Sequence, residues 1–336
     1  MLAFKDKVVL VTGGTGSFGQ KYITRLLDSG IGRKIIVFSR DELKQFEMQQ
    51  SFAKHPKSAR LRFFLGDVRD VERLKIAFRG VDLVIHAAAL KQVPAAEYNP
   101  LEFVKTNIHG AENIITAAVA NDVEKVVALS TDKACSPVNL YGATKLCSDK
   151  IFVAASTMFS KNETRFSVVR YGNVMGSRGS VVPLFRKMIN DGVDALPITD
   201  KRMTRFWITL DQALDLVDLA IRKSQGGEIY VPKIPSVKIT LLATAMAPDL
   251  SHDIIGIRPG EKLHEEMISQ SDSLNTVDIG DHFLILPAFV SDLKDYYLGE
   301  GAKMVSDDFS YTSDNNPDKM DDASLLKMLS DTGFAQ

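Results

Sequence analysis

Short apolar runs rich in β-branched residues alternate with longer amphipathic segments through the first half of the chain. Several runs are apolar without alternation, as expected for strands that are covered on both faces, and the segments between them have room for crossover helices. We therefore predict an α/β fold with a doubly wound parallel sheet of the Rossmann type. Its strands are predicted at residues 7–11, 34–38, 61–65, 82–86, 125–129 and 166–170.

The rhythm changes after Tyr171, where glycines and prolines interrupt the pattern and the periodic segments become shorter. A chain of 336 residues can fold around one dominant core that carries a smaller lobe. We predict that residues 1–172 and about 206–232 form the sheet domain, with a helix at 210–221 packed on it. Residues from about 173 to 205 and from 233 to 336 are predicted to form a smaller mixed α/β lobe. Within it, the polar stretch 307–321 is expected to be a loop or a loosely held tail.

Composition argues against several classes of protein. The formal net charge is −1, which gives no bulk electrostatic reason to bind nucleic acid or an anionic membrane. No apolar run approaches the roughly 18 residues of a membrane span, and we see no secretory signal before the first predicted strand. Cys135 and Cys147 suit free thiols in a reducing compartment, so we expect a cytoplasmic protein. The six histidines are scattered, and we expect no metal site.

The segment after the first predicted strand has the glycine spacing of a phosphate-binding loop. Such glycines permit a tight turn, close approach of the backbone to a pyrophosphate, and close contact between helix and sheet, with the anion at the helix N-terminus. A turn without a ligand is the alternative, which the strand before and the helical pattern after disfavour. The spacing therefore predicts a dinucleotide site in the sheet domain. Its loop residues are Gly13, Thr15, Gly16, Ser17, Phe18 and Gly19.

The end of the second predicted strand distinguishes the two nicotinamide cofactors. An acidic side chain there binds a ribose hydroxyl, whereas a cation accommodates the extra phosphate of NADP. Ser39 stands where the acid is expected, Arg40 follows it, and Lys44 lies one turn on. An arginine can contact a phosphate through two N–H groups. The sequence therefore favours NADP, with ordinary surface charges as the alternative role of Arg40 and Lys44.

Residues after the third and fourth predicted strands complete the cofactor site. Asp67 and Val68 stand where the adenine is expected. Small residues after the fourth strand allow the backbone to approach the cofactor. They are Ala87, Ala88 and Ala89. Lys91, just beyond them, is expected to contact the cofactor or the substrate.

A candidate catalytic group follows the fifth predicted strand. Thr131, Asp132 and Lys133 close that strand, and Tyr141 and Lys145 open the next predicted helix four residues apart, so they share one helical face. A lysine ammonium beside a phenol, helped by a positive cofactor ring, lowers the pKa of the phenol towards neutrality and makes it a usable base. We therefore predict that these five residues form the catalytic centre and that Tyr141 and Lys145 also contact the cofactor. Helix or loop capping is the alternative role of Thr131 and Asp132, and a plain surface position is that of Lys133.

These motifs resemble those of the extended short-chain dehydrogenase/reductases that act on nucleotide sugars. More specifically, the chain resembles the inverting UDP-N-acetylglucosamine 4,6-dehydratases that begin pseudaminic acid biosynthesis. The resemblance implies an NADP-dependent carbon–oxygen lyase that acts on UDP-N-acetylglucosamine and works as a homo-oligomer, for which a hexamer is one expected form. Besides the glycine loop, the matching runs are residues 38–46, 94–100, 105–110, 130–145, 170–183, 203–207 and 255–267.

The resemblance also implies a reaction path. Tyr141 takes the proton of the carbon 4 hydroxyl as that carbon gives hydride to NADP, and the new ketone acidifies the proton on carbon 5. Retaining relatives have Asp-Glu at the positions of Asp132 and Lys133. Here Lys133 is assigned as the base at carbon 5, and Asp132 as the acid that helps the carbon 6 hydroxyl leave as water. Hydride return to carbon 6 and reprotonation from the opposite face give a UDP-4-keto-6-deoxy-L-arabino-hexosamine.

The predicted substrate contacts come largely from the same runs. A sugar diphosphate needs cations, which Arg205 and Arg258 offer, while Asn173 and Glu261 suit sugar or ribose hydroxyls. A structural salt bridge or a helix cap is the alternative role of such residues. The full predicted set is Lys91, Thr131, Lys133, Asn173, Val181, Val182, Thr199, Met203, Arg205, Arg258 and Glu261.

Three other functions fit part of the pattern: a retaining 4,6-dehydratase, a nucleotide-sugar 4-epimerase, and a non-catalytic NADP-sensing module. An epimerase shares the tyrosine and lysine but needs no base at carbon 5, so Lys133 disfavours it. A sensor reuses the dinucleotide fold, and the presence of all five candidate catalytic residues disfavours it.

Overall fold

The computed structural model describes residues 4–159, 164–177 and 179–334, so the outermost predicted domain limits, residues 1 and 336, lie outside the described residues. A 10-stranded sheet with the order β16-β14-β15-β10-β6-β5-β4-β1-β2-β3 dominates the fold. The strands from β3 across to β10 are parallel, and β15, β14 and β16 extend the sheet in antiparallel pairs. The parallel strands are β1 (Val8–Thr12), β2 (Lys34–Ser39), β3 (Leu61–Leu65), β4 (Leu83–His86), β5 (Lys125–Thr131), β6 (Arg165–Tyr171) and β10 (Ile229–Pro232).

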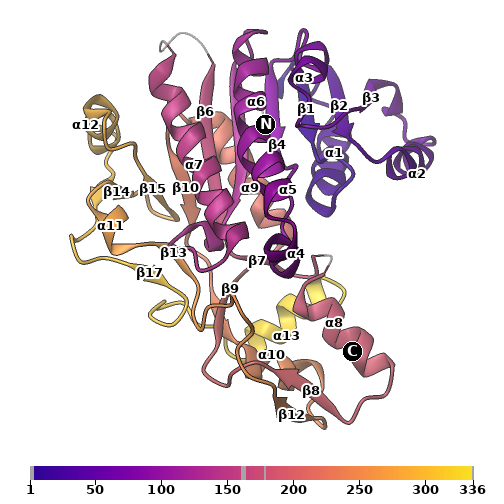
Figure 1. The fold of residues 1–336 in the computed structure, drawn as a ribbon, viewed down its shortest axis with the longest axis vertical. Helices are drawn as coiled ribbons and strands as arrows, with labels where there is room; N and C mark the ends of the chain where they lie inside the picture. Colours follow the sequence, from indigo (N-terminus) through magenta and orange to yellow (C-terminus); the bar gives the residue numbers. More distant parts are fainter. Residues whose placement is uncertain (1–3, 160–163, 178, 335–336) are drawn as a thin grey trace.

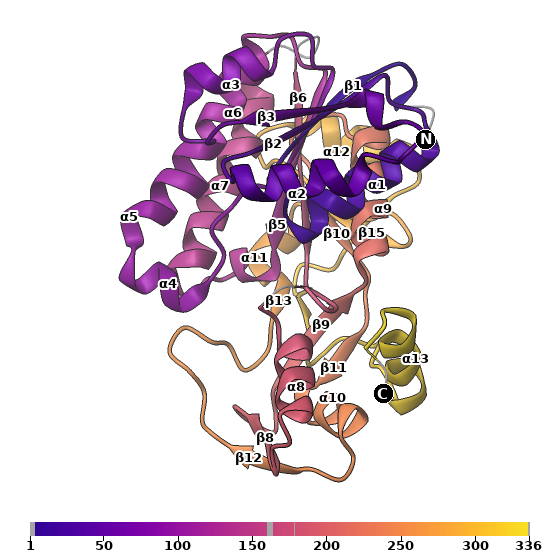
Figure 2. The ribbon, with the colours of Figure 1, turned by 90° about the vertical axis from the view of Figure 1, so that its right-hand side faces the viewer.

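The predicted doubly wound sheet is confirmed, and each of the six predicted runs forms one of these strands. Helices cover both faces, with α3, α6 and α7 on one side and α1 and α9 on the other (Figure 2). This double cover explains why β1 and β4 are buried at every position. The helices of this part are α1 (Ser17–Ser29), α2 (Glu42–Phe52), α3 (Val71–Ala77), α4 (Val93–Tyr98), α5 (Pro100–Phe103), α6 (Gly110–Val119), α7 (Leu140–Met158) and α9 (Leu210–Lys223).

A smaller part lies beyond one end of the large sheet and carries the C-terminus (Figure 1). It has its own apolar core, in which Phe185, Trp207 and Leu242 are buried. In one of its sheets β9 lies between β11 and β7, and in the other β12 pairs with β8. The strands here are β7 (Asn173–Val174), β8 (Ala195–Ile198), β9 (Thr204–Ile208), β11 (Ser236–Lys238) and β12 (Ser251–Ile254), and the helices are α8 (Val181–Asn190), α10 (Ile239–Met246) and α13 (Asp322–Asp331).

The predicted boundary at residue 233 needs a correction. Three later strands join the large sheet instead of the smaller lobe, with α11 (Gln270–Ser273) and α12 (Ser291–Gly299) beside them (Figure 1). They are β14 (Thr276–Asp278), β15 (His282–Ile285) and β16 (Lys303–Met304). Strands of two to four residues carry too little periodicity to be distinguished from loops in the sequence.

The polar stretch 307–321 is not a loose tail. Its β17 (Tyr311–Thr312) pairs with β13 (Glu266–Ile268), and Ser313 and Asn316 are buried. Asn316 Nδ2 donates a hydrogen bond to the Ile234 carbonyl at 2.9 Å. The prediction failed because these polar side chains are satisfied inside the protein instead of by water.

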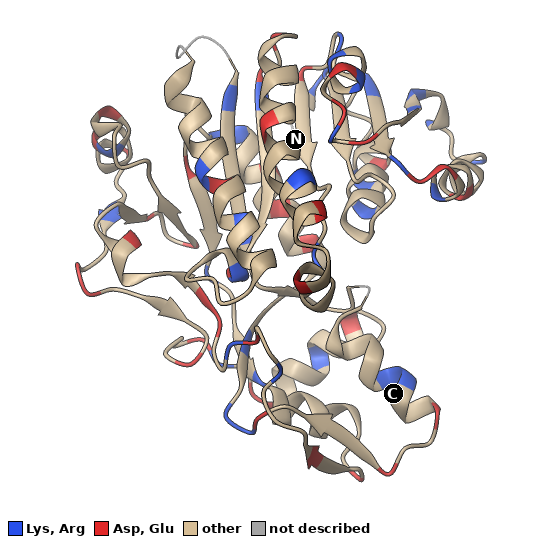
Figure 3. Cartoon of the chain, viewed as in Figure 1, with Lys and Arg blue, Asp and Glu red and all other residues tan. Residues whose placement is uncertain are grey.

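Charged residues of both signs are interspersed over both parts of the chain, in keeping with the small net charge (Figure 3). None of the described helices combines the length and the apolarity that a membrane crossing requires.

Candidate active site

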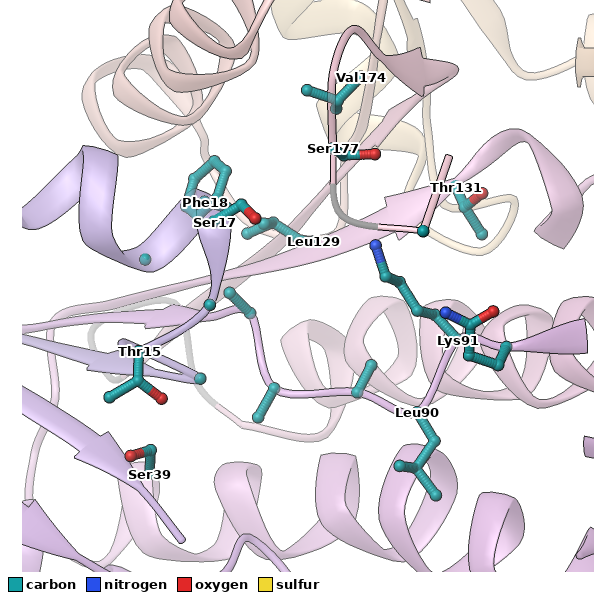
Figure 4. Close-up of a pocket in the computed structure, with 18 of the residues that line it drawn as sticks. Thr15, Ser17, Phe18, Ser39, Leu90, Lys91, Leu129, Thr131, Val174 and Ser177 are labelled. Carbon is teal, nitrogen blue, oxygen red and sulfur yellow. The ribbon is translucent and has the colours of Figure 1, made fainter. Parts of the chain in front are cut away.

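A cleft of about 710 Å³ lies at the carboxyl ends of the parallel strands, where the large sheet meets the smaller part. In Figure 4, Thr15 and Ser39 lie towards one end, while Thr131 and the Lys91 side chain lie towards the other. The cleft brings together every residue predicted to bind the cofactor. These lining residues are Gly13, Thr15, Gly16, Ser17, Phe18, Gly19, Ser39, Arg40, Lys44, Asp67, Val68, Ala87, Ala88, Ala89, Lys91, Tyr141 and Lys145.

The glycine loop has a shape that larger residues would not allow. Gly13 has a φ of +64°, and a Cβ there would lie 2.9 Å from the Ala88 nitrogen. A Cβ at Gly19 would lie 2.5 Å from the Gly14 Cα, so α1 packs directly on the loop. The helix begins at Ser17, with its first N–H groups beside the cleft. This cradle fits the pyrophosphate of a dinucleotide.

The two cations at the end of β2 line the same cleft. Arg40 lies 3.7 Å from a carboxylate oxygen of Asp67, and Lys44 lies 2.7 Å from one of Asp41. Both cations are about half exposed, and ion pairs at the surface contribute about 1 kcal/mol or less, so a phosphate can compete for the cations. Ser39 lines the cleft beside them and adds no negative charge.

A tight connection leads from β5 to α7. It contains a 3-10 turn, Asp132–Ala134, and Asn139, which accepts a hydrogen bond of 2.8 Å from the Gly142 N–H and caps the helix. Gly142 lets the helix lie against the turn, because a Cβ there would come within 2.2 Å of the Lys133 carbonyl oxygen. The side chains of this turn and helix that line the cleft are Lys133, Tyr141 and Lys145.

Lys133 lies between two buried carboxylates. Its Nζ is 3.0 Å from Asp132 Oδ1 and 3.1 Å from Glu265 Oε1. Burial disfavours the ammonium, but the two negative charges outweigh it and hold the pKa of Lys133 above its ordinary value. Burial raises the pKa of Asp132, whereas for Glu265 the charges of Lys133 and Arg205 outweigh burial and lower the pKa. Lys133 is therefore an ammonium, and of the two carboxyl groups Asp132 holds a proton more strongly.

Tyr141 departs from the expected behaviour. Burial raises its pKa to about 12, against the expectation of a phenol brought towards neutrality. The charge of Lys133 and the Thr131 side chain act in the opposite direction. Burial also lowers the pKa of Lys145, which Asp149 partly offsets. In the protein itself, the cation that favours the tyrosinate is thus Lys133.

The predicted substrate residues fall into two groups. Lys91, Thr131, Lys133 and Asn173 line the cleft, and burial lowers the pKa of Lys91, helped by the Lys133 charge. The others lie outside the cleft lining. Among these, Val182 and Met203 are buried in the core of the smaller part, Thr199 donates a hydrogen bond to Met203 Sδ at 3.1 Å, and Val181 opens α8. For Val182 and Met203 the structure indicates packing instead of substrate contact.

The predicted diphosphate cations are engaged by the protein. Arg205 is buried and donates to three backbone carbonyl groups at 2.7 to 3.1 Å. Arg258 is exposed and forms two hydrogen bonds with Glu261 at 2.8 and 3.2 Å. Arg205 also lies 3.6 Å from Glu261. The salt-bridge alternative therefore describes all three residues in this structure.

Glu265 is a residue of the site that the sequence did not single out. It lies in the matching run 255–267, but nothing local distinguishes it from Glu266 beside it. Its role becomes visible only through the contact with Lys133 across the two parts of the fold.

Comparison with known proteins shows which family the chain belongs to. A family model described as polysaccharide biosynthesis protein matches residues 9–287. The chain is 57% identical to a UDP-N-acetylglucosamine 4,6-dehydratase (inverting) of Campylobacter jejuni subsp. jejuni serotype O:23/36 (strain 81-176), over 98% of this chain and 100% of the relative. It is 44% identical to a UDP-glucose 4-epimerase of Rickettsia canadensis (strain McKiel), over 93% of this chain and 92% of the relative.

A solved structure of a dTDP-glucose 4,6-dehydratase from Streptomyces venezuelae, with NAD bound, has a TM-score of 0.67 and 25% identity. The match covers 76% of this chain and 86% of that chain. The fold and the whole-length identity agree on one family. The chain belongs to the polysaccharide biosynthesis protein family and, within it, to the inverting UDP-N-acetylglucosamine 4,6-dehydratases.

Proposed function

We propose that the chain converts UDP-N-acetylglucosamine to a UDP-4-keto-6-deoxy-L-arabino-hexosamine by 4,6-dehydration with inversion at carbon 5. The observation that carries the proposal is that Lys133, hydrogen-bonded to Asp132 at 3.0 Å, lines the same cleft as Tyr141 and the glycine loop. Dehydration needs a base at carbon 5 and an acid at carbon 6, and this pair offers both. The name of the Campylobacter relative supports the same reaction.

In this proposal, a bound nicotinamide dinucleotide supplies the redox chemistry, as hydride acceptor at carbon 4 and hydride donor at carbon 6. Tyr141 accepts the proton of the carbon 4 hydroxyl. The nearby Lys133 charge and the Thr131 side chain favour its ionised form, which suits a group that has to accept a proton. Lys145 lines the cleft one helical turn on.

The Asp132 and Lys133 pair can reach its reactive form without a proton from solvent. At rest the pair is an ammonium and a carboxylate joined by the 3.0 Å hydrogen bond. Transfer of one proton along that bond gives a neutral amine, which can take the carbon 5 proton, and a carboxylic acid, which can give a proton to the leaving hydroxyl. Burial raises the pKa of Asp132 and so favours this transfer, whereas the two carboxylates raise the pKa of Lys133 and oppose it, which makes the ion pair the resting form.

NADP is the proposed cofactor, supported by Arg40, Lys44 and the uncharged Ser39 at the end of β2. We also propose a homo-oligomer, with a hexamer as one form, and a place in pseudaminic acid biosynthesis, both from the family resemblance. A cytoplasmic location is supported by Cys135 and Cys147, which are free thiols.

Mass spectrometry of the product tests the proposed function. The protein incubated with UDP-N-acetylglucosamine and NADP should give a nucleotide sugar lighter by one water, because elimination across carbons 5 and 6 expels the hydroxyl. A product of unchanged mass but altered configuration would instead identify a 4-epimerase, the activity named for the Rickettsia relative.

Tyr141→Phe is the matched control. It removes the phenolic oxygen but keeps the ring, so the variant should still bind NADP but form no product. Product formation by this variant at the wild-type rate would show that another group takes the hydroxyl proton. A wild type that binds NADP and turns over no sugar would favour the sensing module.

A further inference from the structure

We propose that Glu265 is a positioning residue of this active site, contributed by the segment before β13, which fixes the Lys133 ammonium opposite Asp132. The inference rests on the proposed function, because it assigns a role in the dehydration step. It adds a second carboxylate to a site for which the sequence predicts only one.

The geometry of Glu265 is that of a built-in partner. Its side chain is 3% exposed, and Oε1 lies 3.1 Å from Lys133 Nζ. The same oxygen lies 3.6 Å from Arg205 Nε. Glu265 and Asp132 thus each contact the Lys133 ammonium through one carboxylate oxygen. The other oxygen of each carboxylate is buried and has no hydrogen-bond partner among the described residues. Burying such atoms without a partner costs free energy.

The backbone around Glu265 is held as firmly as its side chain. Its N–H donates to Ser313 Oγ at 2.9 Å, and its carbonyl accepts from the Ser313 N–H at 2.8 Å. Arg205, which lies 3.6 Å from the Glu265 carboxylate, is itself fixed by hydrogen bonds to three backbone carbonyl groups. Glu265 therefore has little freedom to follow Lys133, and Lys133 has to adopt the position that Glu265 sets.

The charges around Lys133 come from several elements. The two carboxylates favour its ammonium form, and Arg205 on β9 opposes it. Removing the charge of Glu265 should therefore make the proton of the Asp132 and Lys133 pair easier to lose. The titratable and charged groups that face Lys133 are Asp132, Glu265, Arg205, Tyr141 and Lys91.

Glu265→Gln tests the proposal, because it keeps the shape of the side chain and removes its charge. The readouts are kcat and KM for UDP-N-acetylglucosamine dehydration from neutral to alkaline pH. We expect kcat to fall about 10- to 100-fold while KM stays within about twofold, as for a misplaced catalytic group. The alkaline limb, where the pair loses its proton, should move to lower pH by about one to three units.

Two further variants separate charge from structure. Glu266→Gln makes the same chemical change one residue on and should leave both kcat and the pH profile unchanged. Glu265→Asp keeps the charge on a shorter side chain, so kcat should fall while the alkaline limb stays at the wild-type position. If Glu265→Gln does not fold, a wild-type kcat for Glu265→Asp overturns the proposal.

Other outcomes also overturn it. A pH profile of Glu265→Gln that superimposes on that of the wild type would leave Glu265 a structural residue only. A raised KM with unchanged kcat would make it a substrate-binding residue. Either result requires a wild type that dehydrates the sugar, whereas a wild type without dehydratase activity contradicts the proposed function itself.

Discussion

Burial and close charge pairs compete for each ionisable side chain of the cleft. Burial prevails at Tyr141, whose pKa rises to about 12, and at Lys145, whose pKa falls. Pairing prevails at Lys133, where two carboxylates lie about 3 Å from the ammonium. The uncharged phenol and the charged lysine at rest are both consequences of this balance.

Arg40 and Lys44 should decide the choice between the two dinucleotides. Replacing both by alanine removes the two cations at the end of β2, and charge-assisted contacts to a phosphate contribute about 1.5 to 3 kcal/mol each. We therefore expect the double variant to bind NADP at least about tenfold more weakly, with little change in its affinity for NAD. Fluorescence titration with each dinucleotide measures both affinities.

Arg79→Ala is the control for this experiment, since Arg79 is exposed and does not line the cleft. It should leave both affinities unchanged. An equal loss of NAD and NADP affinity in the double variant would mean that the two cations do not bind the extra phosphate of NADP.

At the scale of elements, β4 and β1 are joined by a buried polar contact at their carboxyl ends. His86 Nδ1 lies 2.9 Å from Thr12 Oγ1. Burial, helped by the Lys145 charge, lowers the pKa of His86 from 6.5 to about 3. The folded protein therefore binds this proton more weakly than the unfolded chain does, so the stability contributed by neutral His86 is present above pH 6.5 and is lost towards pH 3.

The consequence is a measurable acid sensitivity. Between pH 6.5 and about 3, His86 should lower the free energy of unfolding by about 1.4 kcal/mol per pH unit. Urea unfolding of the wild type and of His86→Phe at a series of pH values isolates this contribution, because the carboxylates titrate in both proteins. If the free energy of unfolding changed with pH by the same slope in both proteins, the pKa of His86 would not differ between the folded and unfolded states.

The elements differ in how well the sequence predicts them. Strands such as β1 and β4 are buried on both faces and need continuous apolar runs, which makes them easy to find. The short strands β14 and β16 are the last two at one side of the sheet and, with three and two residues, contain no such run. The stretch around β17 has polar residues that hydrogen-bond inside the fold, so composition alone suggests a loop.

At the scale of the whole molecule, residues 260–265 contact the connection between β5 and α7, which contains the 3-10 turn Asp132–Ala134. Asn139 Nδ2 donates to the Gly260 carbonyl at 2.7 Å, and Lys262 Nζ donates to the Cys135 carbonyl at 2.5 Å. Glu265 follows in the same segment and pairs with Lys133. The connection between β5 and α7 is thus held in place by contacts from residues 260–265.

This long-range arrangement limits what the sequence can predict of the site. The glycine loop and the Tyr141 and Lys145 pair follow from spacing alone, because each lies within one loop or one helix. The partners of Lys133 and of Arg205 come from separate segments, and only the fold brings them together. The sequence therefore suggests that Arg205 is available to bind a phosphate, whereas in the structure its guanidinium donates hydrogen bonds to three backbone carbonyl groups.

The central claim is that the Lys133 and Asp132 pair removes the carbon 5 proton and that a proton is added back from the opposite face, and it has a direct test. UDP-N-acetylglucosamine is incubated with the protein and NADP in deuterated water, and the product is followed by NMR. We expect one deuterium at carbon 5 and the inverted configuration at that carbon. A product without deuterium at carbon 5, or with the original configuration, would contradict the account.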